Sequence, residues 1–231
     1  MMTDILKQEI IGQYLDHLGN KSFPCVAAHE AATKNYVRSF VADHLGCPKD
    51  DHAILHFLYD FVDEYRNAKS GYYSSAIIFQ EPKDITEEVF ETLLWQRLQS
   101  ISDLDAVQYD YDVRVSPDTS SPHFSFSLKE EAFYVIGLHE GSKRQARKFK
   151  YPTLVFNPHA QFEQLRQENL YSKMQQIVRK RDILYSGSVN PMLADFGSSP
   201  EVFQYSGREY DKEWKCPLKI KHVFIRHTPS P

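Results

Sequence analysis

The chain has 231 residues, of which 42% are hydrophobic, and its formal net charge at neutral pH is −4. This length favours one large domain with its own core, and the composition excludes a disordered chain, a collagenous fibre and a disulfide-stapled miniprotein. With 27 basic and 31 acidic residues, the chain lacks the overall positive charge that binds nucleic acid through its phosphates.

Three helices are predicted in the first third of the chain. Their apolar residues recur at the three- and four-residue spacing of one helix face. The predicted helices span 6–18, about 27–45 and about 50–67. Glycine-containing stops at Gly19 and Gly46 end the first two of them.

The middle of the chain predicts strands between further helices. Aromatic and β-branched residues, alternating residues or continuous apolar runs indicate strands at 72–79, 123–128, 132–138 and 153–156. Helical spacing returns at 84–101 and 159–181. Because strands and helices do not alternate regularly, we predict an α+β fold. It is one domain over 1–231, with a central mostly antiparallel or mixed sheet packed by helices, a helical N-terminal third and a loose tail from about 218 to 231.

Targeting signals and cysteine usage bear on the compartment. The longest apolar runs are too short for the roughly 20 residues of a membrane-spanning helix, and the N-terminus lacks a secretory signal pattern. Cys25, Cys47 and Cys216 are an odd and widely spaced set, which argues against a disulfide framework or a structural zinc site. We therefore expect a cytoplasmic protein with neither a membrane nor a nucleic-acid partner.

Cys25 is the first candidate for chemistry, because Phe23-Pro24-Cys25 directly precedes a predicted helix. Unpaired N–H groups at a helix start lower the pKa of a thiol, which suits a nucleophile or a metal ligand. The alternative is a small buried hydrophobic residue. His29 lies one turn beyond and shares a face with Cys25.

Other polar clusters have both a functional and a structural interpretation. His52 and His56 are spaced as a metal-ligand pair, or are simply exposed or hydrogen-bonded. The basic turn that contains Arg144 and Arg147 can hold carboxylates or phosphates, or can face solvent. His159 lies at the mouth of a predicted helix, where polar residues build sites or cap the helix.

Several short motifs follow one another along the loops and turns. They are Phe-Pro-Cys, Gly-Leu-His before the basic turn, Phe-Asn-Pro-His-x-Gln-Phe-Glu, Asn-Pro-Met-Leu-x-Asp-x-Gly, Gln-Tyr-Ser-Gly-Arg and Trp-x-Cys-Pro. In this order, over about residues 20–217, they resemble the YqcI/YcgG family of bacterial proteins. The resemblance implies haem chemistry, because similar proteins in natural-product pathways are haem-dependent enzymes that N-hydroxylate guanidino groups, including that of arginine.

The resemblance further implies that Cys25 binds the iron of haem b. A thiolate ligand pushes electron density onto iron and favours O–O cleavage, which suits oxygen insertion into an N–H bond. The expected function is a haem-thiolate monooxygenase that N-hydroxylates a guanidino or amino group of a small molecule such as arginine or a derivative. Electrons are expected from a separate reductase, and a homodimer is the assembly considered.

The remaining site residues are assigned by the chemistry that a haem and a guanidinium need. Haem propionates need cations, a guanidinium needs carboxylates, and the many Phe and Tyr side chains can wall a macrocycle. The catalytic candidates are Cys25 and His29, which is expected near the haem edge. The predicted cofactor-binding residues are Phe23, Pro24, Cys25, His139, Arg144, Arg147 and His159. The predicted substrate-binding residues are Glu163, Asn190, Asp195, Glu201, Tyr205 and Arg208.

Two alternative functions remain open at this point. One is a haem-binding or sensing protein without turnover, and the other is an enzyme without haem that uses Cys25 as a nucleophile. Thiol alkylation and the absorbance of the purified protein distinguish them.

Overall fold

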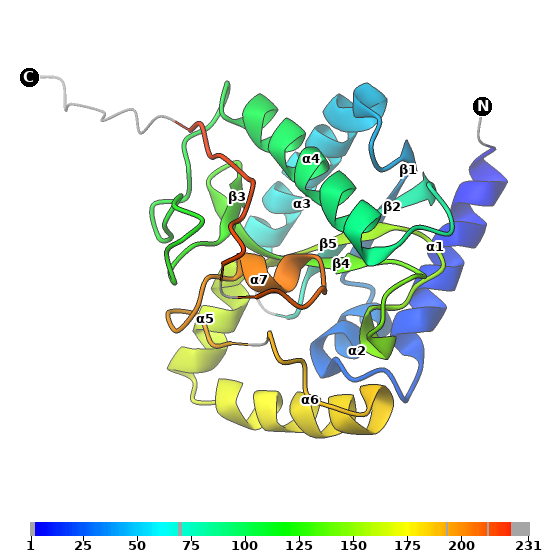
Figure 1. Ribbon diagram of the computed structural model, residues 1–231, viewed down its shortest axis with the longest axis vertical. Coiled ribbons are helices and arrows are strands. Elements are labelled where there is room, and N and C mark those ends of the chain that lie inside the picture. Colours follow the sequence, from blue (N-terminus) through cyan, green and yellow to red (C-terminus); the bar gives the residue numbers. More distant parts are fainter. Residues whose placement is uncertain (1–2, 69–70, 193, 212, 223–231) are drawn as a thin grey trace, which may run out of the picture.

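A mixed sheet lies at the centre of the molecule (Figure 1). The computed structural model describes residues 3–68, 71–192, 194–211 and 213–222, and in these ranges five strands pair in the order β1-β2-β5-β4-β3. The strands are β1 (Val37–His44), β2 (Ser74–Glu81), β3 (Phe126–Leu128), β4 (Glu131–Leu138) and β5 (Thr153–Pro158). β1 and β2 are parallel and the other neighbours are antiparallel. The predicted α+β fold with a mixed sheet is confirmed.

Helices cover both faces of this sheet. They are α1 (Asp4–Gly19), α2 (Val26–Thr33), α3 (Asp51–Asn67), α4 (Glu87–Asp105), α5 (His159–Gln167), α6 (Tyr171–Ser186) and α7 (Val202–Tyr205), with 3₁₀ turns at Pro48–Asp50 and Gln145–Arg147. The α3 and α4 helices pack on one face, and α1 and α2 on the other. The α6 helix runs along the lower side of the molecule in Figure 1, separate from α4. None of the helices in the described ranges is both long and apolar enough to cross a membrane.

The two cores arise from strand alternation. Successive side chains of a strand point to opposite faces of the sheet. In β2, Ile77 and Phe79 enter the core with α3 and α4, whereas Ala76 and Ile78 enter the core with α1 and α2. By the same alternation, β4 and β5 direct Tyr134, Ile136, Val155 and Asn157 toward the face covered by α1 and α2. The candidate site lies on this face.

The helix predicted over 27–45 is wrong in its second half. The α2 helix ends at Thr33, and β1 begins at Val37. Asn35 has a φ of 57°, a left-handed conformation that stops a right-handed helix. The apolar residues after it pair with β2 along the sheet edge, so tertiary pairing decides between two plausible periods.

Two other predictions also differ from the structure. The helix predicted over 159–181 is two helices, α5 and α6, with Asn169 at a φ of 58° between them. The expected loose tail is packed as far as it is described, because Leu218 and His222 are buried. Residues 223–231 of that tail lie outside the described residues. The other predicted helices and strands agree in type with the structure.

Candidate functional site

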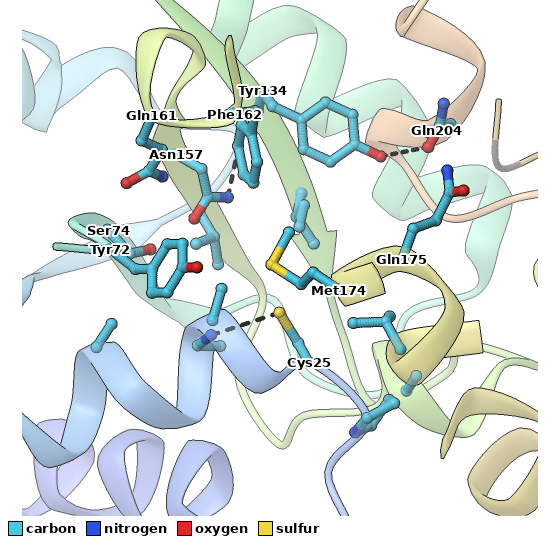
Figure 2. Close-up of a pocket in the computed structure, with 18 of the residues that line it drawn as sticks. Cys25, Tyr72, Ser74, Tyr134, Asn157, Gln161, Phe162, Met174, Gln175 and Gln204 are labelled. Carbon is cyan, nitrogen blue, oxygen red and sulfur yellow. Dashed lines mark hydrogen bonds between the residues drawn. The ribbon is translucent and has the colours of Figure 1, made fainter. Parts of the chain in front are cut away.

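A cavity of about 260 Å³ lies between the second face of the sheet, the start of α2 and the inner side of α6 (Figure 2). Most of the surface that lines it is apolar. The polar and sulfur-containing residues of the lining come from separate parts of the chain, and they include Cys25, Tyr134, Arg144, Arg147, His159, Met174, Asp182, Asn190, Glu201 and Gln204. Phe23 and Pro24 also line the cavity. The sheet, several helices and a C-terminal loop region therefore converge on one space.

Cys25 borders the cavity at the first turn of α2. It is the N-cap residue of that helix, and its Sγ accepts a hydrogen bond from the N–H of Ala28 at 3.4 Å. Figure 2 shows the Cys25 and Met174 sulfur atoms pointing toward one another, from α2 and α6. The predicted position of this thiol at a helix start is confirmed, and the thiol borders the cavity.

The predicted lowering of the Cys25 pKa is wrong for the protein without a ligand. Burial raises the pKa of this thiol, and that effect exceeds the opposite effects of the Ala28 and Ala27 N–H groups and of Arg181 and Arg147. Here the free-energy cost of removing the thiolate from water exceeds the stabilisation that the start of the helix gives to its negative charge. Cys25 is therefore a neutral thiol at neutral pH until a ligand compensates its charge.

Arg147 places a buried positive charge at the cavity. Its guanidinium donates to the main-chain oxygens of Gly137 at 3.2 Å and Gln204 at 3.0 Å. Within the described ranges no carboxylate forms an ion pair with it, and burial lowers the pKa of its side chain. A buried cation bonded to neutral groups is costly, so the cavity attracts an anionic ligand group.

Arg144 lines the same side of the cavity but already has an anionic partner. It pairs with Asp182 on α6 and donates to the main-chain oxygen of Ser188. The other carboxylate oxygen of Asp182, Oδ1, is buried without a hydrogen-bond partner among the described residues. This acceptor at the cavity suits a donor-rich ligand.

Glu201 supplies a second buried carboxylate. Its Oε2 accepts hydrogen bonds from Ser125 Oγ at 2.9 Å and Tyr205 OH at 3.3 Å. Its Oε1 lies 3.6 Å from Nδ1 of His159, and Nε2 of the same imidazole lies 3.1 Å from Glu163 Oε1. Glu201 and His159 both line the cavity, as predicted, whereas Glu163 lies behind the imidazole toward solvent.

The structure does not bring all the predicted residues to the cavity wall. Those outside its lining are His29, His139, Glu163, Asp195, Tyr205 and Arg208. Of the predicted substrate-binding residues, Asn190 and Glu201 do line the cavity.

Most of the residues outside the lining have another side-chain partner. His139 stacks on Phe90 at 4.2 Å between ring centroids, on the α4 side of the sheet. Arg208 pairs with Glu91 of α4. Two more have side-chain partners: Asp195 accepts a hydrogen bond from Gln175 of α6, and Glu163 pairs with Arg166.

His52 and His56 are both exposed on α3, which packs on the opposite face of the sheet from this cavity. The lining residues that the motifs did not single out include Tyr134, Met174 and Asp182. Met174, Val178 and Asp182 follow one another at four-residue spacing, a helix-face pattern that could have indicated them.

Comparisons with known proteins can be set beside this geometry. The sequence model of the YqcI/YcgG family matches residues 14–219. The chain is similar to YqcI, an uncharacterized protein of Bacillus subtilis (strain 168), with 28% identity over 240 residues, covering 95% of this chain and 93% of that one. It is also similar to the uncharacterized protein YcgG of the same organism, with 25% identity, covering 88% of this chain and 83% of that one. No solved structure matches the chain.

Proposed function

The chain belongs to the YqcI/YcgG family, and from this premise and the geometry of the cavity we propose that it is a haem-thiolate monooxygenase. Its proposed reaction is N-hydroxylation of a guanidino or amino group of a small molecule such as arginine or a derivative. One observation carries the proposal: the Cys25 thiol and Arg147 line the same apolar cavity, and within the described residues the buried Arg147 guanidinium bonds main-chain oxygens and no carboxylate.

The donor atoms present suit a haem. Cys25 offers the thiolate for the iron, and its proton leaves on binding because a coordinating thiol is deprotonated by the metal. The Ala28 N–H and the positive charges of Arg181 and Arg147 then stabilise the sulfur's negative charge. A haem bound through thiolate supplies activated oxygen for insertion into an N–H bond.

The walls and charges of the cavity suit the rest of the macrocycle. Ile136, Leu138, Val155 and Phe162 contribute apolar surface, and Arg147 is a free partner for a propionate. At about 260 Å³, the cavity lies near the lower end, about 300 Å³, of small-molecule sites. We therefore expect α6, which buries only Asp182 among its described residues, to move outward when a haem enters.

Two acidic groups suit a guanidinium or ammonium substrate. Glu201 Oε1 and the unpartnered Oδ1 of Asp182 both lie in the lining of the cavity. A guanidinium presents several N–H donors in one plane, and paired carboxylates satisfy them while excluding water. These residues bind and orient the substrate, while a separate reductase is the proposed electron donor.

Absorbance spectroscopy tests the cofactor. Protein expressed with a haem supply should show a Soret band that moves to the thiolate position in the ferrous carbonyl complex. Cys25→Ser should lose that signature, while Cys47→Ser, at an exposed position, should keep it. A colourless protein that ignores added haemin would refute the proposal, and alkylation of Cys25 ahead of the other cysteines would then favour a cysteine nucleophile.

Turnover assays test the reaction separately. The haem-loaded protein with a reductase and oxygen should convert an arginine-like compound to its N-hydroxy product, whereas the haem spectrum without product indicates a sensor. Glu201→Gln should weaken substrate binding about tenfold, which is about 1.4 kcal/mol. Glu163→Gln is the matched control, because that carboxylate lies outside the cavity lining.

A further inference from the structure

We propose that four aromatic side chains, Tyr134, Tyr205, Trp95 and Trp214, form a relay that carries single electrons between the protein surface and the cavity. The proposal rests on the proposed function only for the oxidant that the relay would serve. Its role is to reduce a cavity oxidant that has found no substrate, before that oxidant damages the protein.

The rings follow one another at near-contact distances. Tyr134 lines the cavity, and its ring centroid is 6.1 Å from that of Tyr205. Tyr205 stacks on Trp95 at 6.0 Å, and Trp95 lies 5.9 Å from Trp214. Tyrosine and tryptophan are the side chains most readily oxidised by one electron, so each ring is a stepping point. Short steps between such rings are faster than one long transfer.

The two ends of the relay differ in exposure. Tyr205 is fully buried and Trp95 is 4% exposed, so an electron hole that reaches them is shielded from solvent. Trp214 is half-buried and can meet a reductant in solution. The relay therefore joins the cavity to the α4 side of the molecule, across the sheet from α6.

Glu201 and Glu91 provide the proton and charge chemistry that such a relay needs. Tyr205 OH lies 3.3 Å from Glu201 Oε2, so the phenol can give its proton to this carboxylate as it loses an electron. Trp214 donates its indole N–H to Glu91 Oε1 at 3.1 Å, and the negative charge stabilises the oxidised indole.

The steps balance when hydrogen peroxide is the oxidant at the haem and ascorbate the reductant in solution. Two ascorbate molecules each give one electron and one proton: the electrons pass through the relay, the protons are exchanged through the solvent, and the peroxide becomes two molecules of water. Each electron reaches the cavity from Tyr205 through the ring of Tyr134, and the Tyr205 proton moves to Glu201. An electron from Trp95 then reduces Tyr205, whose proton returns; Trp214 in turn reduces Trp95, and ascorbate reduces Trp214.

A light-driven measurement tests the relay without any haem. The parent protein carries Cys47→Ser, Lys215→Cys with a tethered ruthenium photosensitiser beside Trp214, and Tyr210→Phe, which removes a tyrosine stacked on Trp214 at 3.9 Å. A flash with an electron acceptor oxidises Trp214. We expect the tryptophanyl absorbance to decay into tyrosyl absorbance as Tyr205 is oxidised.

Variants decide where the electron hole goes. Trp95→Phe and Tyr205→Phe should each lose the tyrosyl signal, and Glu201→Gln should reduce it by removing the proton acceptor. Tyr109→Phe, outside the relay, should leave it unchanged. A full tyrosyl signal in folded Trp95→Phe would overturn the proposal. If that variant does not fold, Trp214→Phe gives the same decision from the surface, because it removes the first step.

A second measurement connects the relay to the proposed function. In haem-loaded protein treated with peroxide, ascorbate should slow the bleaching of the Soret band, and Trp95→Phe should lose this protection. Unchanged protection in Trp95→Phe contradicts the relay. A protein that takes up no haem contradicts the proposed function instead, and the light-driven measurement still decides the relay.

Discussion

In this structure, the pKa and the position of individual side chains depend more on burial than on the neighbouring residues in the sequence. Cys25 illustrates this, because the helix start that suggested an acidic thiol is present, yet desolvation raises the pKa of the thiol. His139 is a second case, since the motif around it suggested a ligand and the imidazole is instead stacked on Phe90.

His139 predicts a pH dependence of stability. Burial lowers its pKa from 6.5 to about 4, so the unfolded chain binds more protons than the folded one between these values. Stability should therefore fall as the pH drops from 6.5 toward 4, by up to about 3 kcal/mol. Urea unfolding above and below this window should show a smaller pH effect in His139→Gln. The exposed His52→Gln should match the wild type, and an equal pH effect in both variants would contradict the assignment.

Gly141 predicts a steric effect on stability. A Cβ at this position would lie 2.2 Å from the main-chain oxygen of Ile85, and a main-chain atom cannot rotate away. Gly141→Ala should therefore lower the free energy of unfolding by about 1–3 kcal/mol. Gly12→Ala on α1 is the control, because a Cβ there meets nothing within 4 Å and should be neutral or stabilising by up to about 1 kcal/mol. Similar losses in both would argue against the clash.

At the level of elements, buried polar links hold helices to the sheet. Arg97 of α4 is 3% exposed. It pairs with Asp51 of α3 and donates to the main-chain oxygens of His44, Leu45 and Cys47 after β1. One side chain thus connects both helices of this layer to the sheet edge.

Removing Arg97 should be costly. Arg97→Met removes the cationic partner of the buried Asp51 carboxylate and the donor to three main-chain oxygens, so we expect a loss of about 3–5 kcal/mol in unfolding free energy. Arg38→Met removes a more exposed pair with Glu64 and should cost about 1 kcal/mol or less. Denaturant titrations of the two variants make the comparison. Equal losses in unfolding free energy would show that the buried Arg97 stabilises the fold no more than the more exposed Arg38 does.

Most elements could be predicted from the sequence, and the exceptions have a common cause. The strongly periodic α3 and the alternating or apolar strands were visible because one face of each is buried by neighbours. The β1 strand was not, because Val37 to Val41 fits a helical face as well as a strand, and only pairing with β2 decides. Asn35 and Asn169, both with positive φ, ended helices where no glycine or proline signalled a stop.

At the scale of the whole molecule, the site was predictable only in part. The motifs indicated Cys25 and His159, and the chemical needs of a haem and a guanidinium indicated Arg147 and Glu201; all four line the cavity. Neither argument could indicate which other predicted residues would lie outside the lining, since Arg208 and Asp195 lie in loops whose direction depends on tertiary partners. Tyr134 was missed because its strand has no polar signature.

Binding of a haem should stabilise the folded protein and reduce local opening of α6. A ligand that binds only the folded state adds about 2.7 kcal/mol of stability at a hundredfold excess over its Kd. We expect haem to raise the unfolding temperature and to slow hydrogen exchange of α6 amides, while α4 amides change little. Cys25→Ser should lose most of both effects. Equal protection of α4 and α6 would indicate a site other than this cavity.

The strand order has a consequence for how the chain is made. The β2 strand pairs with the central strand β5, although the segment from Pro82 to Pro152 separates them in sequence. During synthesis, β2 leaves the ribosome with β1 on one side and an unpaired edge on the other until β5 follows. Such an edge is a template for pairing with other chains. The nascent protein therefore depends on the prompt arrival of its second half, and truncated chains that end before β5 are the forms most exposed to aggregation.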